Sequence, residues 1–127
     1  MIKVLLAEDH DDNRDMLLRR LVRAGYDVHG AIDGADAVQQ AVDWQPDLIL
    51  MDVSMPVMSG LEATVKIREK MGRSIRIIAL TAHAMNESRD ACMEAGCDAF
   101  ATKPVDLPNL LKEIELQLGN RQQEQAA

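Results

Sequence analysis

The chain has 127 residues, of which 47% are hydrophobic and 28% charged, and its formal net charge is -7. This length fits one domain with a real hydrophobic core, and the composition excludes a disordered chain and a disulfide scaffold. The negative charge argues against nucleic acid or an anionic membrane surface as the partner, and apolar runs such as Val4–Ala7 are far too short to span a bilayer.

Short apolar runs alternate with stretches of helical periodicity along the whole chain. The runs are rich in Val, Ile, Leu or small residues and end at polar or turn residues, which predicts buried strands. In chain order they are Lys3–Ala7, Tyr26–Gly30, Asp47–Met51, Ile75–Leu80 and Ala99–Thr102. Apolar residues recur at helical spacing after each run. We therefore predict an α/β fold with one doubly wound, five-stranded parallel sheet and five helices.

The ends of the chain and its cysteines complete this outline. We expect residues 1–119 to form the folded domain and residues 120–127, which are mostly polar, to be a flexible tail or the stub of a linker. Cys92 and Cys97 are predicted to be free thiols, because a chain of this size needs no disulfide to fold. The first residues lack the apolar stretch of a signal peptide, and we expect a cytoplasmic protein.

Polar residues follow four of the predicted strands, at the end where parallel sheets bind their ligands. Glu8 and Asp9 follow the first strand, Asp52 the third, Thr81 the fourth and Lys103 the fifth. Close carboxylates repel by about 4 kcal/mol per pair at an effective dielectric constant of about 20. Either a cation relieves this repulsion or one carboxyl stays protonated. Oxygen ligands in a site open to water favour Mg²⁺.

A carboxylate, a divalent metal, a lysine and a threonine are the groups needed for phosphoryl transfer onto the carboxylate. Asp52 is the best candidate for the nucleophile, because it ends the central strand with acids on one side and Thr81 and Lys103 on the other. The Lys103 ammonium would bind one phosphoryl oxygen as a point charge. The Thr81 hydroxyl would donate a hydrogen bond to another.

These residues occur in motifs that resemble the receiver domain of two-component response regulators. The motifs are Glu8-Asp9, Met51–Gly60 with the sequence MDVSMPVMSG, Ala79–Ala82 and Lys103-Pro104, and the resemblance covers roughly residues 2 to 118. It implies a flavodoxin-like fold with strand order 2-1-3-4-5. It also implies that Asp52 accepts a phosphoryl group from a phosphohistidine, on a histidine kinase or a histidine phosphotransfer protein.

The resemblance implies a role for each remaining site residue. Mg²⁺ would be held by Asp9, Asp52 and the backbone carbonyl of Ser54, with Glu8 acting mainly through a metal-bound water. The peptide bond between Lys103 and Pro104 would be cis.

The resemblance also implies a switch. Thr81 would move toward the phosphoryl group and Phe100 would turn inward, which reshapes the face of the fourth helix, fifth strand and fifth helix. A downstream protein would dock on this face, and the alternative for Phe100 is a plain core position. Ser54 and His83, two residues beyond Asp52 and Thr81, would tune the lifetime of the phosphoryl group.

Other functions of the same fold fit less well. A pseudo-receiver that acts only as an interaction module would lack a site residue, and none is missing. A flavin carrier would need glycines and hydroxyls in the first loop, where this sequence has acids. An aspartyl-phosphate hydrolase would need an Asp-x-Asp motif, which is absent at Asp52. We therefore expect a regulatory phosphoacceptor domain and not an enzyme. The segment Leu80–Met85 resembles receivers of hybrid histidine kinases, whereas the methionine before the first strand favours a stand-alone regulator.

Overall fold

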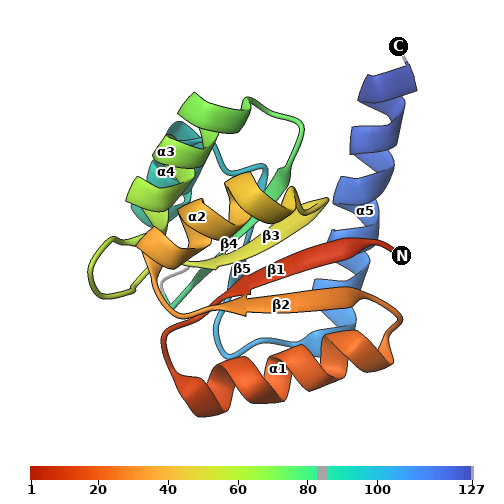
Figure 1. The fold of residues 1–127 in the computed structure, drawn as a ribbon, viewed down its shortest axis with the longest axis horizontal. Coiled ribbons are helices and arrows are strands. Elements are labelled where there is room, and N and C mark those ends of the chain that lie inside the picture. The colour runs from red at the N-terminus through yellow and green to blue at the C-terminus, as the bar shows by residue number, and fades with distance from the viewer. Residues whose placement is uncertain (83–85, 127) are drawn as a thin grey trace.

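A single parallel sheet organises the molecule. The computed structural model describes residues 1–82 and 86–126, and its strands lie in the order β2-β1-β3-β4-β5 (Figure 1). The elements are β1 (Lys3–Ala7), α1 (Asp11–Arg23), β2 (Asp27–Ala31), α2 (Gly34–Trp44), β3 (Leu48–Asp52), α3 (Gly60–Met71), β4 (Arg76–Thr81), α4 (Asn86–Ala95), β5 (Ala99–Thr102) and α5 (Leu107–Ala126). The predicted fold class and strand order are confirmed.

The boundaries of the elements differ slightly from those predicted. Strands β1 and β5 match the prediction, whereas β2, β3 and β4 each begin and end one residue later. Ladder hydrogen bonds define a strand in the structure, while the prediction followed apolar character, so differences of one residue are expected. Helix α5 continues to Ala126 and therefore includes residues 120–126. That segment contains Arg, Gln, Glu and Ala, which favour helix, and it has no proline.

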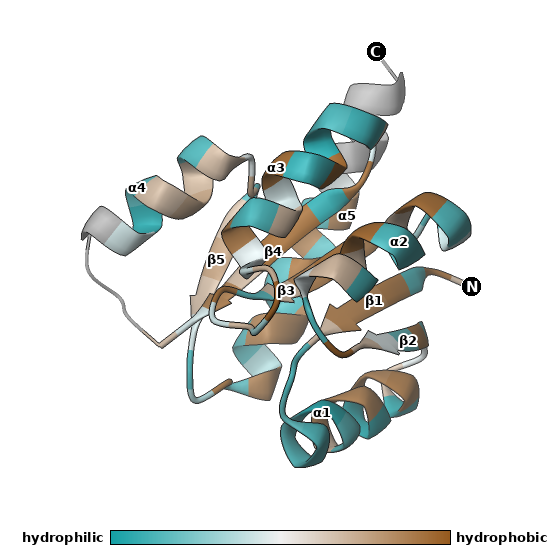
Figure 2. Ribbon diagram, turned by 60° about the vertical axis from the view of Figure 1, so that its left-hand side comes forward, coloured by the Kyte–Doolittle hydropathy of each residue, from teal (hydrophilic) through white to brown (hydrophobic). Residues whose placement is uncertain are grey.

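The sheet separates two hydrophobic clusters. Successive side chains of a strand point to opposite faces. In β3, Leu48 and Leu50 therefore pack with α1 and α5, whereas Ile49 and Met51 pack with α2, α3 and α4. The helices cover the corresponding faces in Figure 1. Figure 2 shows hydrophobic colour along β1 and hydrophilic turns on the outer sides of the helices. Both faces of the sheet are buried, which explains why the strands read as continuous apolar runs.

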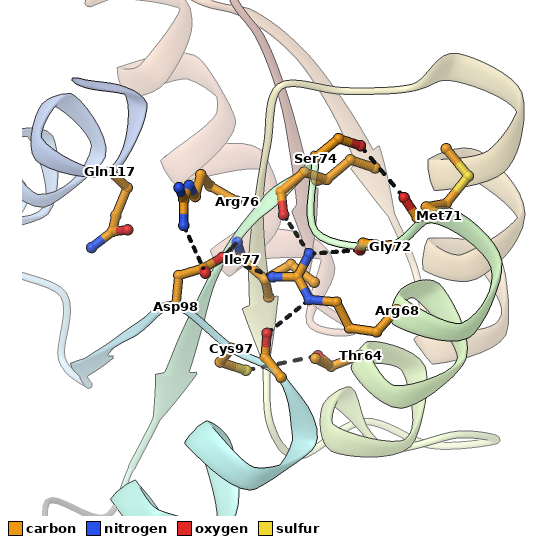
Figure 3. Close-up of polar contacts among 12 residues, drawn as sticks. Thr64, Arg68, Met71, Gly72, Ser74, Arg76, Ile77, Cys97, Asp98 and Gln117 are labelled. Carbon is orange, nitrogen blue, oxygen red and sulfur yellow. Dashed lines mark hydrogen bonds and ion pairs between the residues drawn. The ribbon is translucent and has the colours of Figure 1, made fainter. Parts of the chain in front are cut away.

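A charged clamp of Arg68, Arg76 and Asp98 joins α3 to the amino-terminal ends of β4 and β5 (Figure 3). The Asp98 carboxylate accepts hydrogen bonds from Arg68 Nη2 at 2.7 Å, Arg76 Nη1 at 3.0 Å and the backbone nitrogen of Ile77 at 2.9 Å. Arg68 also donates to the carbonyl oxygens of Gly96 and Ile75. The clamp therefore holds one helix and two strands together at the amino-terminal ends of the strands. The predicted site lies at the opposite, carboxyl ends.

The helix ends follow local rules of capping. Ser59 accepts a hydrogen bond from the backbone nitrogen of Glu62 at the start of α3. Gly96 ends α4 with φ of +113°, and Cys97 N donates to the carbonyl of Cys92, which is the pattern of a Schellman motif.

Cys92 and Cys97 are buried free thiols. Among the helices of the described chain, none has the length and apolar character needed to cross a bilayer.

Candidate functional site

The carboxyl ends of β1, β3, β4 and β5 converge at one edge of the sheet. Lys103, directly after β5, places its Nζ 2.7 Å from Asp52 Oδ2 and 3.1 Å from Glu8 Oε2. The Lys103 backbone nitrogen donates to the Thr81 carbonyl at 2.8 Å, and the Lys103–Pro104 peptide bond is cis. The structure therefore brings together side chains that lie 95 and 51 residues from Lys103 in the sequence.

The three acids form a cluster with the donor set of a hard divalent cation. Carboxylate oxygens of Glu8, Asp9 and Asp52 lie within 4.8 Å of one another. Glu8 Oε1 is buried and has no hydrogen-bond partner among the described residues, so an oxygen is left to bind an ion or an ordered water. Oxygen ligands of this kind suit Mg²⁺, which keeps several of its own waters. The residues present therefore fit Mg²⁺.

Ser54 lies at the rim of this cluster. Its backbone nitrogen donates to Asp52 Oδ1 at 3.2 Å, and its side chain is exposed. This hydrogen bond holds the backbone of Ser54 next to the carboxylate of Asp52. The backbone carbonyl of Ser54, which we expect to bind Mg²⁺, is therefore close to the acid cluster. His10, which follows the acid pair, is exposed and directly precedes α1, and its side chain makes no capping hydrogen bond to that helix.

Burial and mutual contact set the protonation of the carboxyl groups. Burial, together with the neighbouring Glu8, raises the pKa of Asp52 to about 6, and Lys103 opposes this shift. Burial alone would raise the pKa of Glu8, but hydrogen bonds with Asp52 and Lys103 bring it below its ordinary value. Burial would lower the pKa of Lys103, and contacts with Asp52 and Glu8 raise it instead. Without a bound cation, Asp52 therefore retains a proton more readily than Glu8 does.

The substitution Asp52→Asn is expected to stabilise the metal-free chain in a pH-dependent way. The pKa of Asp52 is about 6 in the folded protein and about 4 in the unfolded chain, so the folded protein binds this proton more tightly. The stability that the bound proton provides is complete below about pH 4 and is lost as the pH rises through about 6. The stability gained by Asp52→Asn should therefore be larger at pH 8 than at pH 4 by on the order of 2–3 kcal/mol. Urea unfolding in EDTA at both pH values measures this difference.

An exposed acid provides the control for this measurement. Glu69 lies on the surface of α3, and Glu69→Gln should change the stability by no more than about 0.5 kcal/mol. A stability gain of Asp52→Asn that is the same at pH 4 and pH 8 would contradict the assignment of the proton to Asp52.

The loop after Asp52 packs closely beneath the site. Gly60, the first residue of α3, donates its backbone N–H to the carbonyl of Val53 at 2.9 Å. A Cβ atom on Gly60 would lie 2.0 Å from the carbonyl oxygen of Asp52, so only glycine fits here. The exposed Val57 adopts a φ of +67°, and Met58 N donates to the Pro56 carbonyl in a γ-turn around it. This conformation is energetically unfavourable for a β-branched residue. The residue types around Val57 in the sequence do not predict it.

The residues assigned to the switch lie on β4 and β5. Thr81 is buried at the end of β4. Phe100 is half-buried against the hydrophobic cluster on the side of α2, α3 and α4. The guanidinium carbon of Arg89 lies 5.7 Å from the centroid of the Phe100 ring, which is within the range of a cation–π contact. His83, to which we assigned an influence on phosphoryl lifetime, lies outside the described residues.

The sequence did not reveal one residue that touches the acid pair. Arg14 of α1 donates a hydrogen bond from Nη1 to the carbonyl oxygen of Glu8 at 2.7 Å. An arginine on the polar side of a predicted helix resembles any solvated charge, so sequence pattern alone does not distinguish Arg14 from other surface arginines.

Comparison with known proteins identifies relatives along nearly the full domain. The family model of the response regulator receiver domain matches residues 4–115. The response regulator DivK of Brucella anthropi is 33% identical, and the alignment covers 92% of this chain and 96% of DivK. The receiver domain of the sensor histidine kinase PA1611 from Pseudomonas aeruginosa PAO1, solved with magnesium coordinated in its active site cleft, is 36% identical. It superposes with a TM-score of 0.86 over 93% of this chain and 98% of that one.

Much longer proteins also contain a matching segment. The hybrid signal transduction histidine kinase I of Dictyostelium discoideum is 42% identical, and the alignment covers 88% of this chain. This chain spans only 7% of the length of that kinase, and 3% of the length of hybrid kinase G from the same organism.

Proposed function

Because this chain belongs to the response regulator receiver family of two-component signalling, we propose that Asp52 accepts a phosphoryl group from a phosphohistidine in a Mg²⁺-dependent reaction. The observation that carries this proposal is the contact of Asp52 with Lys103, at the edge where Glu8 and Asp9 also lie. A buried carboxylate beside an ammonium and two further acids provides a nucleophile, a phosphoryl-binding cation and metal ligands in one place.

The proposed reaction moves the phosphoryl group and leaves the bond count unchanged. An oxygen of Asp52 attacks the phosphorus, the bond from phosphorus to the histidine nitrogen breaks, and the electron pair of that bond returns to the imidazole. Lys103 binds a phosphoryl oxygen, and the Thr81 hydroxyl donates a hydrogen bond to another. Mg²⁺ held by Asp9, Asp52 and the Ser54 carbonyl, with Glu8 acting through a metal-bound water, would neutralise the charge that develops on the phosphoryl oxygens.

The signal would leave the domain through protein docking. Receiver domains interact with histidine kinases or phosphotransfer proteins, and such a protein is the proposed phosphoryl donor. We propose the face of α4, β5 and α5, which includes Phe100, as the docking surface for a downstream protein. The domain would act in the cytoplasm as a regulatory phosphoacceptor. Its relatives include both a regulator of nearly the same length and segments of hybrid kinases, and either arrangement is compatible with this chemistry.

Labelling with a small phosphodonor tests this proposal. Wild-type protein incubated with acetyl phosphate and Mg²⁺ should gain one phosphoryl group, detected by intact mass, and should gain none in EDTA. Asp52→Ala should abolish the labelling. Asp12→Ala, which removes an exposed acid at the start of α1, should retain it. Labelling of Asp52→Ala at the wild-type level would refute the proposed acceptor.

A further inference from the structure

Arg14 reaches back from α1 to the peptide group that joins the two acids after β1. Its Nη1 donates to the carbonyl oxygen of Glu8 at 2.7 Å, and this carbonyl belongs to the peptide bond between Glu8 and Asp9. The orientation of that peptide fixes both ψ of Glu8 and φ of Asp9. The contact therefore acts on the directions in which two carboxylates of the acid cluster leave the backbone.

The guanidinium is itself held in place from several sides. Arg14 Nη2 pairs with Asp11 Oδ1 at 2.5 Å, and only 18% of the Arg14 side chain is exposed. The aliphatic part of Arg14 lies against Gly30 of β2, where an added Cβ would come within 3.0 Å of Arg14 Cδ. Helix α1 runs beside β2 in Figure 1, which is the arrangement that this contact requires.

The backbone of Glu8 is fixed on its other side as well. Its N–H donates to the carbonyl of Ala31, the last residue of β2, at 3.0 Å. Arg14 satisfies the carbonyl of the same residue. Both polar groups of this backbone segment thus have partners outside the loop, and the acid pair is presented by a fixed peptide and not by a free turn.

From these contacts we infer that Arg14 is a positioning residue for the divalent cation site: it orients the Glu8–Asp9 peptide through a hydrogen bond made in a slot left by Gly30. This inference rests on the proposed function, which requires Mg²⁺ at the acid cluster. Groups that orient metal ligands without touching the metal typically contribute about 10–100-fold to metal affinity.

The charge of Arg14 makes the prediction specific, because two possible effects have opposite signs. A cation near an acid cluster repels Mg²⁺, so removing the charge alone would strengthen Mg²⁺ binding. Loss of the hydrogen bond that orients the peptide would weaken Mg²⁺ binding. A weaker affinity after loss of Arg14 is therefore the signature of positioning.

Isothermal titration of Mg²⁺ into the metal-free protein provides the test. Arg14→Ala should raise the Kd for Mg²⁺ by about tenfold. Gly30→Ala, which retains the charge but crowds the Arg14 stem, should raise the Kd by a smaller factor, and Arg14→Lys should fall between wild type and Arg14→Ala. Arg19→Ala is the matched control: Arg19 lies on the same helix with 74% of its side chain exposed, and its replacement should not weaken binding.

The outcomes separate this inference from the proposed function. Unchanged or stronger Mg²⁺ binding in both Arg14→Ala and Gly30→Ala would overturn the role of Arg14 while leaving the metal site in place. A wild-type protein that binds no Mg²⁺ would refute the proposed function and this inference with it. A purely structural role would lower the stability in EDTA but leave the Kd of the folded variants at the wild-type value. If Arg14→Ala fails to fold, the Kd of Gly30→Ala decides.

Discussion

Asp98→Ala is expected to lower the free energy of unfolding by about 3–5 kcal/mol, the range found when one partner of a buried ion pair is removed. The Asp98 carboxylate accepts three hydrogen bonds, from Arg68, Arg76 and the backbone of Ile77, and only 8% of its side chain is exposed. Its removal takes the Asp98 carboxylate away from two buried guanidinium groups and the acceptor away from one backbone N–H.

Urea unfolding compared with a matched surface pair measures this effect. Asp15 pairs with Arg19 on α1, where 60% and 74% of the two side chains are exposed, and Asp15→Ala should cost no more than about 0.5 kcal/mol. A domain of this size has a total stability of about 5–15 kcal/mol, so the two variants should be clearly distinguishable. Equal losses in Asp98→Ala and Asp15→Ala would show that the clamp contributes no more than a surface pair.

Gly60→Ala is expected to destabilise the fold and to disturb the phosphoacceptor. The new Cβ would lie 2.0 Å from the carbonyl oxygen and 2.8 Å from the carbonyl carbon of Asp52. Backbone atoms cannot move aside as a flexible side chain does, so α3 or the end of β3 must shift. We expect a loss at the upper end of the roughly 1–3 kcal/mol typical of overpacking, together with slower labelling by acetyl phosphate.

Two other glycines calibrate this result. Gly34 resembles Gly60, since a Cβ there would lie 2.1 Å from the carbonyl oxygen of Met58, and Gly34→Ala should destabilise without touching Asp52. A Cβ on Gly119, within α5, meets nothing within 4 Å, and Gly119→Ala should stabilise the helix by about 0.5–1 kcal/mol. The unfolding midpoint measures stability and the labelling rate measures the site. A Gly60→Ala protein as stable and as reactive as wild type would contradict the close approach of α3 to Asp52.

The parts of this fold that the sequence predicted are those that depend on short patterns. Buried strands appeared as apolar runs because both faces of the sheet are covered, as the two clusters around β3 show. The strand ends predicted which acids would meet, and Glu8, Asp9 and Asp52 do lie together. The strand order was implied by the family resemblance and is confirmed, while the roles of these residues in phosphoryl transfer remain predictions.

Other features depend on contacts that no local pattern records. Arg14 and Arg68 look like ordinary surface charges in the sequence, yet each is largely buried and donates to a backbone carbonyl outside its own helix, six residues away for Arg14 and 28 for Arg68. Val57 has a left-handed backbone conformation, which β-branched residues disfavour, so the preference of valine predicts a different conformation. Residues 120–126 are helical in the structure, and most of these polar residues also favour helix, so polar composition alone does not distinguish a tail from the end of a helix.

The charged clamp is part of a longer row at the amino-terminal edge of the sheet. Lys3 N donates to Asp47 Oδ2 at 2.8 Å, Arg76 N donates to the Asp47 carbonyl at 3.2 Å, and Arg76 pairs with Asp98. A second polar row lies at the carboxyl edge, in Glu8, Asp52, Thr81 and Lys103. Four of the five strands, β1, β3, β4 and β5, each join one member of each row at the same spacing of five residues: 3 and 8, 47 and 52, 76 and 81, 98 and 103.

This common spacing determines where the chain can change its length. Five residues of strand span about 16 Å, so the two rows stay the same distance apart only when β1, β3, β4 and β5 keep the same number of residues between them. Inserting or deleting one residue inside any of these strands would move one row out of line and turn its side chains to the opposite face. The loops between helices and strands carry no such constraint. Length variation among relatives should therefore be confined to the loops.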